Sequence, residues 1–234
     1  LTLNLSSVKG EIKHSPDWTP EYLDIGMSDL PSRPPMFQIP DGVAYRQQYL
    51  SGGAGTGWTN WNNNGDFVTF YIQDSIDQSR TPIFTYYMIC QSGHGGSSNG
   101  NHPCYSQEQN TIRDNLASSS TMNGYWSDLK LFFEKSAAFP NQTVLLHVEP
   151  DMWGHIHQLS ANDNASNYEF TVQVDGSGHP DLNGIADTPQ GFVEALYRLR
   201  DVTGAQNVQI GYHLSMWGTL VDFAISNPSP AELQ

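Results

Sequence analysis

Residues 143–157, TVLLHVEPDMWGHIH, decide the fold that the rest of the sequence predicts. Their first half, Val144 to Val148, is a short apolar run, which is typical of a strand buried on both faces of a parallel sheet. Pro150 cannot donate a hydrogen bond to a sheet, so the strand should end near it, and residues 151–157 are expected to form a loop. In α/β folds the loops that follow the strands bind ligands. The stretch therefore predicts a central strand with a site at its end.

Strand alternation is expected to place His147, Glu149 and Asp151 on one face of this strand. Two carboxylates held close together cannot both ionise at little cost, so one of them should stay protonated near neutral pH. A protonated carboxyl is what the protonation of a leaving group requires. Asp151 and Glu149 are therefore the candidate catalytic residues.

Two other interpretations of these residues stay open. A carboxylate in a strand can form a structural ion pair with an arginine such as Arg46. His155 and His157, with His147 and Asp151 nearby, also offer enough ligand types for a metal. Since His-x-His pairs are common in loops, we predict no metal and no cofactor.

Further apolar runs, at Val43 to Leu50, Pro82 to Cys90 and Asn207 to Leu214, predict three more strands. Helical patterns separate the strands, over Phe67 to Gln78, Glu108 to Leu116 and Tyr125 to Ala137 (capped by Asn123). A further helix is expected to begin at Pro189, after the cap Thr188, and to end at Gly204. This alternation predicts an α/β fold of parallel strands with right-handed crossovers and long loops at the strand ends, a (β/α) TIM-like barrel that is distorted or partial. A full barrel typically has about 250 residues. A fragment of a longer barrel, a half barrel that self-assembles and an open sheet are all open.

The chain is expected to form one domain over residues 41–234, preceded by a lead-in over residues 1–40 that packs on it. The lead-in begins with a candidate strand, Leu1 to Leu5, and then contains six prolines, which cannot sustain a helix. A polar stretch over residues 158–187 includes Tyr168 to Val174, whose alternation is typical of a hairpin arm.

Charge and cysteine content restrict the partners and the compartment. The net charge of −14, without a Lys/Arg cluster, repels nucleic acids and anionic membranes, so neither is an expected partner. No apolar run approaches the roughly 20 residues of a membrane helix. Cys90 and Cys104 flank a Gly/Ser/Asn-rich loop and predict a disulfide, and glycosylation-type tripeptides begin at Asn4, Asn141 and Asn164. These features predict a secreted, extracellular protein.

Tryptophans follow the predicted strands, at Trp58, Trp61, Trp153 and Trp217. Flat apolar rings with a polar edge suit the faces of sugars, so they are candidate substrate-binding residues. For Trp58 and Trp61 the alternative is that they pack over an edge of the core.

The motif Val148-Glu149-Pro150-Asp151 resembles the I/V-E-P-D motif of the family six cellulases, the endoglucanases and cellobiohydrolases. The later helix and the strand that begins Asn207-Val208, with Trp217 beyond it, are similar to that family's next unit. The aromatic run Phe84 to Cys90, which precedes the loop with Cys104, is similar to an aromatic strand that lies earlier in that family's chain and is followed by a cysteine-bearing loop. The resemblance implies a distorted barrel that hydrolyses a β-linked glucan. It assigns the general acid to Asp151, with Glu149 in support.

The sequence departs from that family where further acids are expected. In the later strand, His213 occupies the position at which that family has an acidic residue. No aspartate is found at the position where the family has one after the strand that ends near Cys90. Two functions are therefore carried forward. The first is a secreted glycoside hydrolase acting on a cellulose-like polysaccharide or oligosaccharide, and the second is a non-catalytic carbohydrate-binding or assembly protein on the same scaffold. Besides the tryptophans, the candidate substrate-binding residues are Arg46, His147 and His213.

Overall fold

A computed structural model describes residues 25–28, 42–93, 103–160, 170–213 and 216–219. The predicted strand Leu1 to Leu5 and most of the proline-rich lead-in lie outside these residues, as do His94 and His102 of the loop after the second predicted strand. Among the helices of the described part, none combines the length and the apolar character that a membrane crossing needs.

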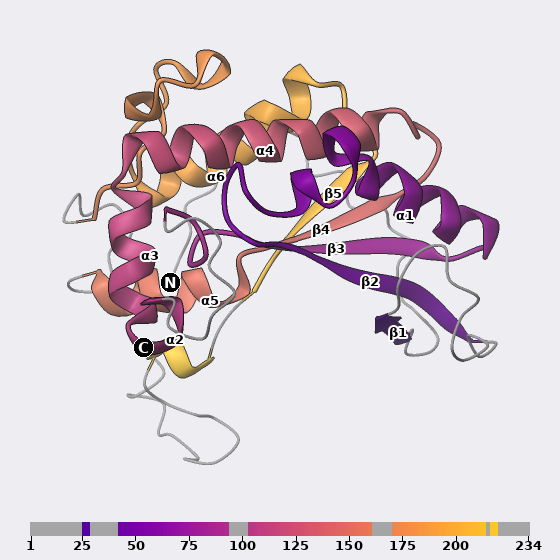
Figure 1. Cartoon of the computed structure of the whole chain (residues 1–234), viewed down its shortest axis with the longest axis horizontal. Helices are drawn as coiled ribbons and strands as arrows, with labels where there is room; N and C mark the ends of the chain where they lie inside the picture. Colours follow the sequence, from indigo (N-terminus) through magenta and orange to yellow (C-terminus); the bar gives the residue numbers. More distant parts are fainter. Residues whose placement is uncertain (1–24, 29–41, 94–102, 161–169, 214–215, 220–234) are drawn as a thin grey trace, which may run out of the picture.

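Five parallel strands form one sheet, and their order in the sheet is their order in the chain (Figure 1). They are β1 (Ile25–Ser28), β2 (Val43–Ser51), β3 (Thr81–Tyr87), β4 (Val144–Val148) and β5 (Val208–Tyr212). The four predicted strands are confirmed as β2 to β5, and the α/β class is confirmed with them. The edge strand β1 was not predicted, because its four residues IGMS are too few to establish a pattern and are largely exposed.

The three longest helices cover one face of this sheet: α1 (Asp66–Asp77), α4 (Ser119–Ala137) and α6 (Pro189–Val202) (Figure 1). Thr188 caps α6 as predicted, since its side chain accepts a hydrogen bond from the Gly191 amide at 3.0 Å and Pro189 fills the first turn. The predicted start of α4 was wrong. Ser118, not Asn123, is its cap, because the apolar stripe extends back to Met122.

Three shorter helices gather beyond the ends of β3 and β4: α2 (Pro103–Ser106), α3 (Glu108–Leu116) and α5 (Pro150–Leu159). The helix α5 corrects the expectation of a loop over residues 151–157. Pro150 ends the strand but also occupies the first turn of the helix, where no N–H donor is needed. Asp151 therefore lies in the first turn of α5, where a carboxylate is favoured by the helix dipole.

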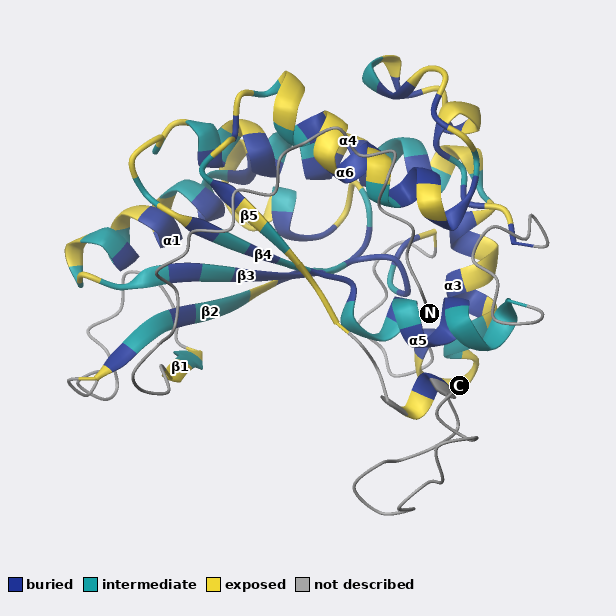
Figure 2. Cartoon of the chain, turned by 180° about the vertical axis from the view of Figure 1, so that it is seen from behind, coloured by how far each residue is buried: buried dark blue, intermediate teal, exposed yellow. Residues whose placement is uncertain are grey.

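The core lies between the sheet and the three long helices (Figure 2). Alternate strand residues point into it, among them Leu50, Phe84, Tyr86, Leu146 and Val148, all essentially inaccessible to solvent. The intervening residues, such as Gln47, Tyr49 and His147, are half-buried or exposed. The expected hairpin arm is not a strand over its described residues, 170–174, although Phe170, Val172 and Val174 are buried in the same core.

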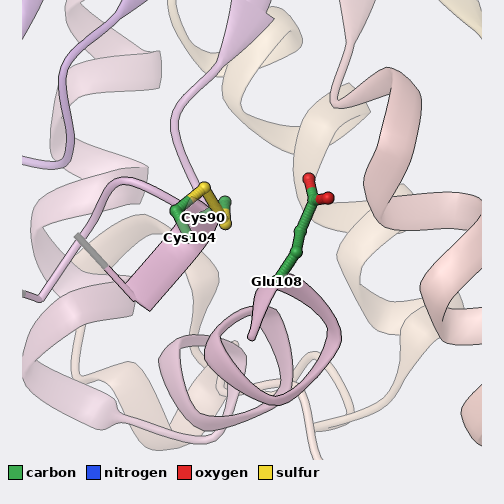
Figure 3. A group of neighbouring side chains, drawn as sticks. All are labelled: Cys90, Cys104 and Glu108. Atoms are coloured by element: carbon green, nitrogen blue, oxygen red, sulfur yellow. A yellow bond between two sulfur atoms is a disulfide. The ribbon is translucent and has the colours of Figure 1, made fainter. Parts of the chain in front are cut away.

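The predicted disulfide between Cys90 and Cys104 is present, and it ties α2 to the segment after β3 (Figure 3). Closing a loop of this length stabilises a fold by about 3 kcal/mol in the chain-entropy model. Replacing both cysteines with serine is therefore expected to lower the free energy of unfolding in urea by about that amount. Adding reductant should lower the free energy of unfolding of the wild type by the same amount and leave that of the double variant unchanged. An unchanged midpoint in the double variant would show that the bridge contributes nothing.

Candidate functional site

Glu149 leaves the strand with its side chain turned into the protein. Its backbone is left-handed, with φ of 43°, and its amide still donates to the Tyr86 carbonyl at 2.8 Å. The carboxylate accepts from the amides of Met88 at 2.8 Å and Ile89 at 3.1 Å, and only 2% of the residue is exposed. The expectation that Glu149 shares a face with His147 is wrong, because side-chain alternation holds only while the backbone stays extended.

Burial raises the pKa of the Glu149 carboxyl to about 8, although the Met88 and Ile89 amides act to lower it. The carboxyl is therefore largely protonated at neutral pH. The repulsion from Asp151, which was the expected reason, is the smallest contribution to this pKa. Glu149 thus stabilises the turn between β4 and α5 through these hydrogen bonds. Its carboxyl does not face the solvent and cannot contact a substrate.

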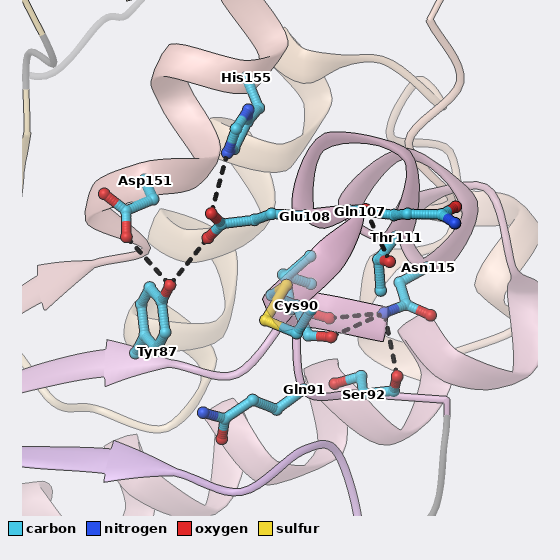
Figure 4. Close-up of a disulfide and its surroundings, with 12 residues drawn as sticks. Tyr87, Cys90, Gln91, Ser92, Gln107, Glu108, Thr111, Asn115, Asp151 and His155 are labelled. Atoms are coloured by element: carbon cyan, nitrogen blue, oxygen red, sulfur yellow. Dashed lines mark hydrogen bonds and ion pairs between the residues drawn. A yellow bond between two sulfur atoms is a disulfide. The ribbon is translucent and has the colours of Figure 1, made fainter. Parts of the chain in front are cut away.

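Asp151 and a second carboxylate, Glu108, meet at one hydroxyl (Figure 4). The Tyr87 hydroxyl, on the last residue of β3, lies 2.9 Å from Asp151 Oδ2 and 3.0 Å from Glu108 Oε1. Glu108 begins α3 and Asp151 lies in the first turn of α5, so the two helix N-termini point their carboxylates at the same place. Burial, then Asp151 and Glu108, raise the pKa of Tyr87 well above its usual value, so the hydroxyl keeps its proton.

His155 and Trp217 extend this cluster along α5. His155 Nε2 lies 3.6 Å from Glu108 Oε2, an ion-pair distance if the ring is protonated (Figure 4). Its ring packs against Trp217, with 4.7 Å between ring centroids, and Trp217 is 41% exposed. His155 is buried, and neither of its ring nitrogens has a hydrogen-bond partner within the described part of the chain.

Trp217 belongs to a short 3₁₀ turn, η7 (Met216–Thr219), that lies directly against α5. Gly218 makes this contact. A Cβ added to it would stand 2.8 Å from the Gly154 Cα, so the two backbones meet with no side chain between them. The carbonyl of Trp217 also accepts a hydrogen bond from Gln158 Nε2 at 3.3 Å.

A polar row crosses the face of the sheet that points away from the long helices. Gln47 Nε2 donates to Thr85 Oγ1 at 2.9 Å, and Thr85 Oγ1 lies 3.4 Å from His147 Nδ1, its neighbour in the β3–β4 register. The rings of His147 and His213 follow, with 5.6 Å between centroids. Burial and then His213 lower the pKa of His147, while the charge of Asp151 acts in the opposite direction. His147 is thus the member of the row that is close enough to Asp151 for the carboxylate charge to act on its pKa.

Several candidate residues are not brought to this cluster. Trp58 and Arg46 are fully buried, so neither can touch a substrate in this conformation. Arg46 is indeed part of a structural ion pair, but its partner is Asp74 at 2.8 Å. Trp153 is mostly covered and donates to the Val148 carbonyl at 2.9 Å. Trp61 precedes α1, is 46% exposed and packs edge-on against Phe67.

The metal alternative rested on His147, Asp151, His155 and His157. In the described ranges, only Cys90, Cys104 and Glu108 bring three potential ligand atoms within 4.8 Å of one another (Figure 3). The two sulfurs of this group are joined in the disulfide, so they supply no thiolate.

Two members of the cluster, Tyr87 and Glu108, were missed by the sequence reasoning. Tyr87 was placed in a predicted strand and Glu108 at the start of a predicted helix, both correctly, but nothing local marks either one as functional. The one available signal was Cys104, which lies four residues before Glu108. Its predicted bridge to Cys90 brings α3 close to the end of β3.

Comparisons with protein-family models, with curated proteins and with solved structures found no match to this chain.

Proposed function

We propose that the protein is a secreted glycoside hydrolase that cleaves a β-linked, cellulose-like glucan, with Asp151 as the general acid. One observation carries the proposal: two carboxylates from different helices, Asp151 and Glu108, contact the same Tyr87 hydroxyl at the end of the central strands. A pair of carboxyl groups is the catalytic centre of most glycoside hydrolases. A structural role alone gives little reason for two acids to converge on one hydroxyl.

The arrangement of the sheet supports a distorted or partial (β/α) barrel. Consecutive parallel strands that lie in chain order, with the long helices on a single face, are the arrangement of that fold (Figure 1). In a barrel the polar row of Gln47, Thr85 and His147 would face the interior. The carboxylates would lie at the C-terminal ends of the strands, where barrel enzymes carry their active sites.

Sugar binding is proposed for the exposed and half-buried groups around the carboxylates. Trp217 presents an exposed indole, and His147 and His213 present ring nitrogens that can bond to hydroxyl groups. The disulfide supports secretion, because such bonds persist in oxidising compartments. The alternative, a non-catalytic carbohydrate-binding or assembly protein, would use the same groups without turnover.

Asp151→Asn tests the proposal. If Asp151 protonates the leaving group, the release of reducing sugar from soluble β-glucan should fall by about a hundredfold or more, with little change in the thermal midpoint. Asp114→Asn, at an exposed position of α3 that pairs with Arg113, is the control and should keep full activity.

Unchanged turnover in Asp151→Asn would contradict the assignment of the general acid. A wild-type protein that hydrolyses no β-glucan, but whose tryptophan fluorescence responds to glucan oligosaccharides, would favour the binding alternative. Neither turnover nor a fluorescence response would remove the carbohydrate proposal altogether.

A further inference from the structure

We propose that the surface around Trp61 is a second carbohydrate-binding site, which holds an uncharged β-glucan chain by stacking it on the exposed indole. This surface, the Trp61 patch, consists of residues 58–65 and Phe70. It lies at the start of α1, one of the long helices that cover the sheet, whereas the carboxylate cluster lies on α3 and α5 beyond the strand ends (Figure 1). The class of ligand rests on the proposed function, but binding at the patch does not depend on catalysis.

The indole of Trp61 is exposed, yet contacts with the core hold it in place. Trp61 is 46% exposed, and its ring packs edge-on against Phe67, with 5.1 Å between centroids. Phe67 in turn stacks on the fully buried Tyr71, with 6.1 Å between centroids. A row of ring contacts therefore leads from the surface into the core. A ring held in this way loses little conformational freedom when a ligand stacks on it.

The turns that carry Trp61 are packed against the body of the protein. They are two short 3₁₀ turns, η2 (Trp58–Asn60) and η3 (Asn63–Gly65). Trp58 is fully buried, and its carbonyl accepts a hydrogen bond from the Trp61 amide at 3.1 Å. Gly65 has a left-handed backbone, and a Cβ added to it would stand 2.9 Å from side-chain atoms of both Trp58 and Leu131. The binding surface is therefore formed before any ligand arrives.

Asparagine side chains flank the indole and are free to bind a ligand. Asn62, Asn63 and Asn64 are exposed, and no hydrogen bond ties their side-chain amides to another described residue. A carboxamide offers two donors and one carbonyl acceptor, which matches sugar hydroxyls because these both donate and accept. The apolar face of a sugar ring can thus lie on Trp61 while its hydroxyl groups bind the amides.

The patch carries no charge. The sequence from Ser51 to Gly65 contains no Asp, Glu, Lys, Arg or His, although the chain has a net charge of −14. The next residue, Asp66, is paired with Lys135 at 2.7 Å. A nucleic acid or an anionic lipid would find no unpaired cation in this stretch, whereas a neutral polysaccharide needs none. The absence of charge from the stretch therefore favours an uncharged glycan.

Phe70 extends the apolar part of the patch along α1. It is 47% exposed and lies three residues after Phe67, the residue that Trp61 contacts. Residues three apart are neighbours on a helix surface, with about 5–6 Å between their Cβ atoms. Exposed apolar rings that lie close together typically mark a binding surface. Two such rings suit a ligand with repeating flat faces, which is a glycan chain rather than a single sugar.

Adsorption to insoluble glucan tests the proposal. Trp61→Ala should lower the affinity for amorphous cellulose by about tenfold, measured by depletion of the protein from solution in the cold. Turnover of a soluble β-glucan should stay at the wild-type level, because Trp61 is not part of the carboxylate cluster. Trp61→Tyr keeps a flat ring and should retain most of the adsorption. Tyr197→Ala, at an exposed ring on α6, is the control and should adsorb like the wild type.

Two further measurements examine the contacts themselves. The double variant Asn62→Ala and Asn63→Ala should adsorb more weakly than the wild type, although Trp61 is kept. It removes no capping hydrogen bond, since the Asn62 side chain makes none at the start of η3. In the wild type, cellohexaose should shift the indole N–H resonance of Trp61, which the Trp61→Tyr spectrum identifies by its absence. This shift decides the question if Trp61→Ala does not fold.

The outcomes separate this proposal from the proposed function. No adsorption by the wild type, wild-type adsorption by folded Trp61→Ala, or no shift of the Trp61 resonance would overturn the binding site. An equal loss of adsorption and of soluble-glucan turnover in Trp61→Ala would also overturn it, because Trp61 would then serve the catalytic site. A lower sedimentation coefficient for Trp61→Ala than for the wild type would assign the patch to a second copy of the chain. If the wild type hydrolyses no glucan but adsorbs through Trp61, the proposed function fails and the binding site stands.

Discussion

Replacing Arg46 with alanine is expected to lower the free energy of unfolding by about 3 kcal/mol or more. The side chain of Arg46 is fully buried, and its guanidinium pairs with Asp74 at 2.8 Å and lies 4.8 Å from the centre of the Tyr71 ring. Alanine removes this packing and leaves the Asp74 carboxylate, whose side chain is 29% exposed, without its counter-ion. Urea unfolding of the purified variant measures the loss.

Arg113→Ala is the matched control, because Arg113 forms its ion pair with Asp114 on the exposed side of α3. Exposed pairs typically contribute between 0 and about 1 kcal/mol, so this variant should stay close to the wild type. Wild-type stability in Arg46→Ala, together with weaker binding of glucan oligosaccharides, would contradict the structural role. Arg46 would then again be a candidate substrate-binding residue.

Glu149→Gln is expected to change how stability depends on pH. The pKa of Glu149 is about 8 in the folded protein and 4.5 by its ordinary value. Below pH 4.5 the carboxyl is protonated in both states and contributes no pH dependence. Between 4.5 and 8 the unfolded chain releases a proton that the folded chain retains, so stability falls as pH rises, by on the order of 1 kcal/mol per pH unit.

Glutamine does not titrate, and its carbonyl oxygen can still accept from Met88 and Ile89. The variant should therefore gain stability relative to the wild type as pH rises from 4.5 to 8, measured by urea unfolding at each pH. Burial also raises the pKa of Asp128, to about 6, but that contribution is common to both proteins. Parallel pH profiles for the wild type and Glu149→Gln would contradict the burial of a titrating carboxyl.

The fold was predictable where short-range signals repeat. Apolar runs mark β2 to β5, and Thr188 with Pro189 marks the start of α6, because caps and hydrophobic periodicity act within a few residues. Pro150 shows the limit of this reasoning, since the same residue that excludes a strand suits the first turn of a helix. The sequence therefore located the end of β4 but not the helix that follows it.

The candidate site was predictable in part. Asp151 was placed just after the strand Val144–Val148, and it lies there, in the first turn of α5. The direction of Glu149 depends on one left-handed backbone conformation, which strand alternation does not anticipate. Glu108 joins the site through contacts between segments more than 20 residues apart in the chain, from Tyr87 to α3, and such contacts leave no local pattern.

The contact between Gly218 and the backbone of Gly154 sets how closely η7 approaches α5. With a Cβ on Gly218, η7 would have to move away from α5, and the indole of Trp217 would move with it. A residue without a side chain thus keeps the Trp217 ring against His155, with 4.7 Å between the ring centroids. Enlarging Gly218 is a route to loosen this ring contact without altering His155 or Trp217.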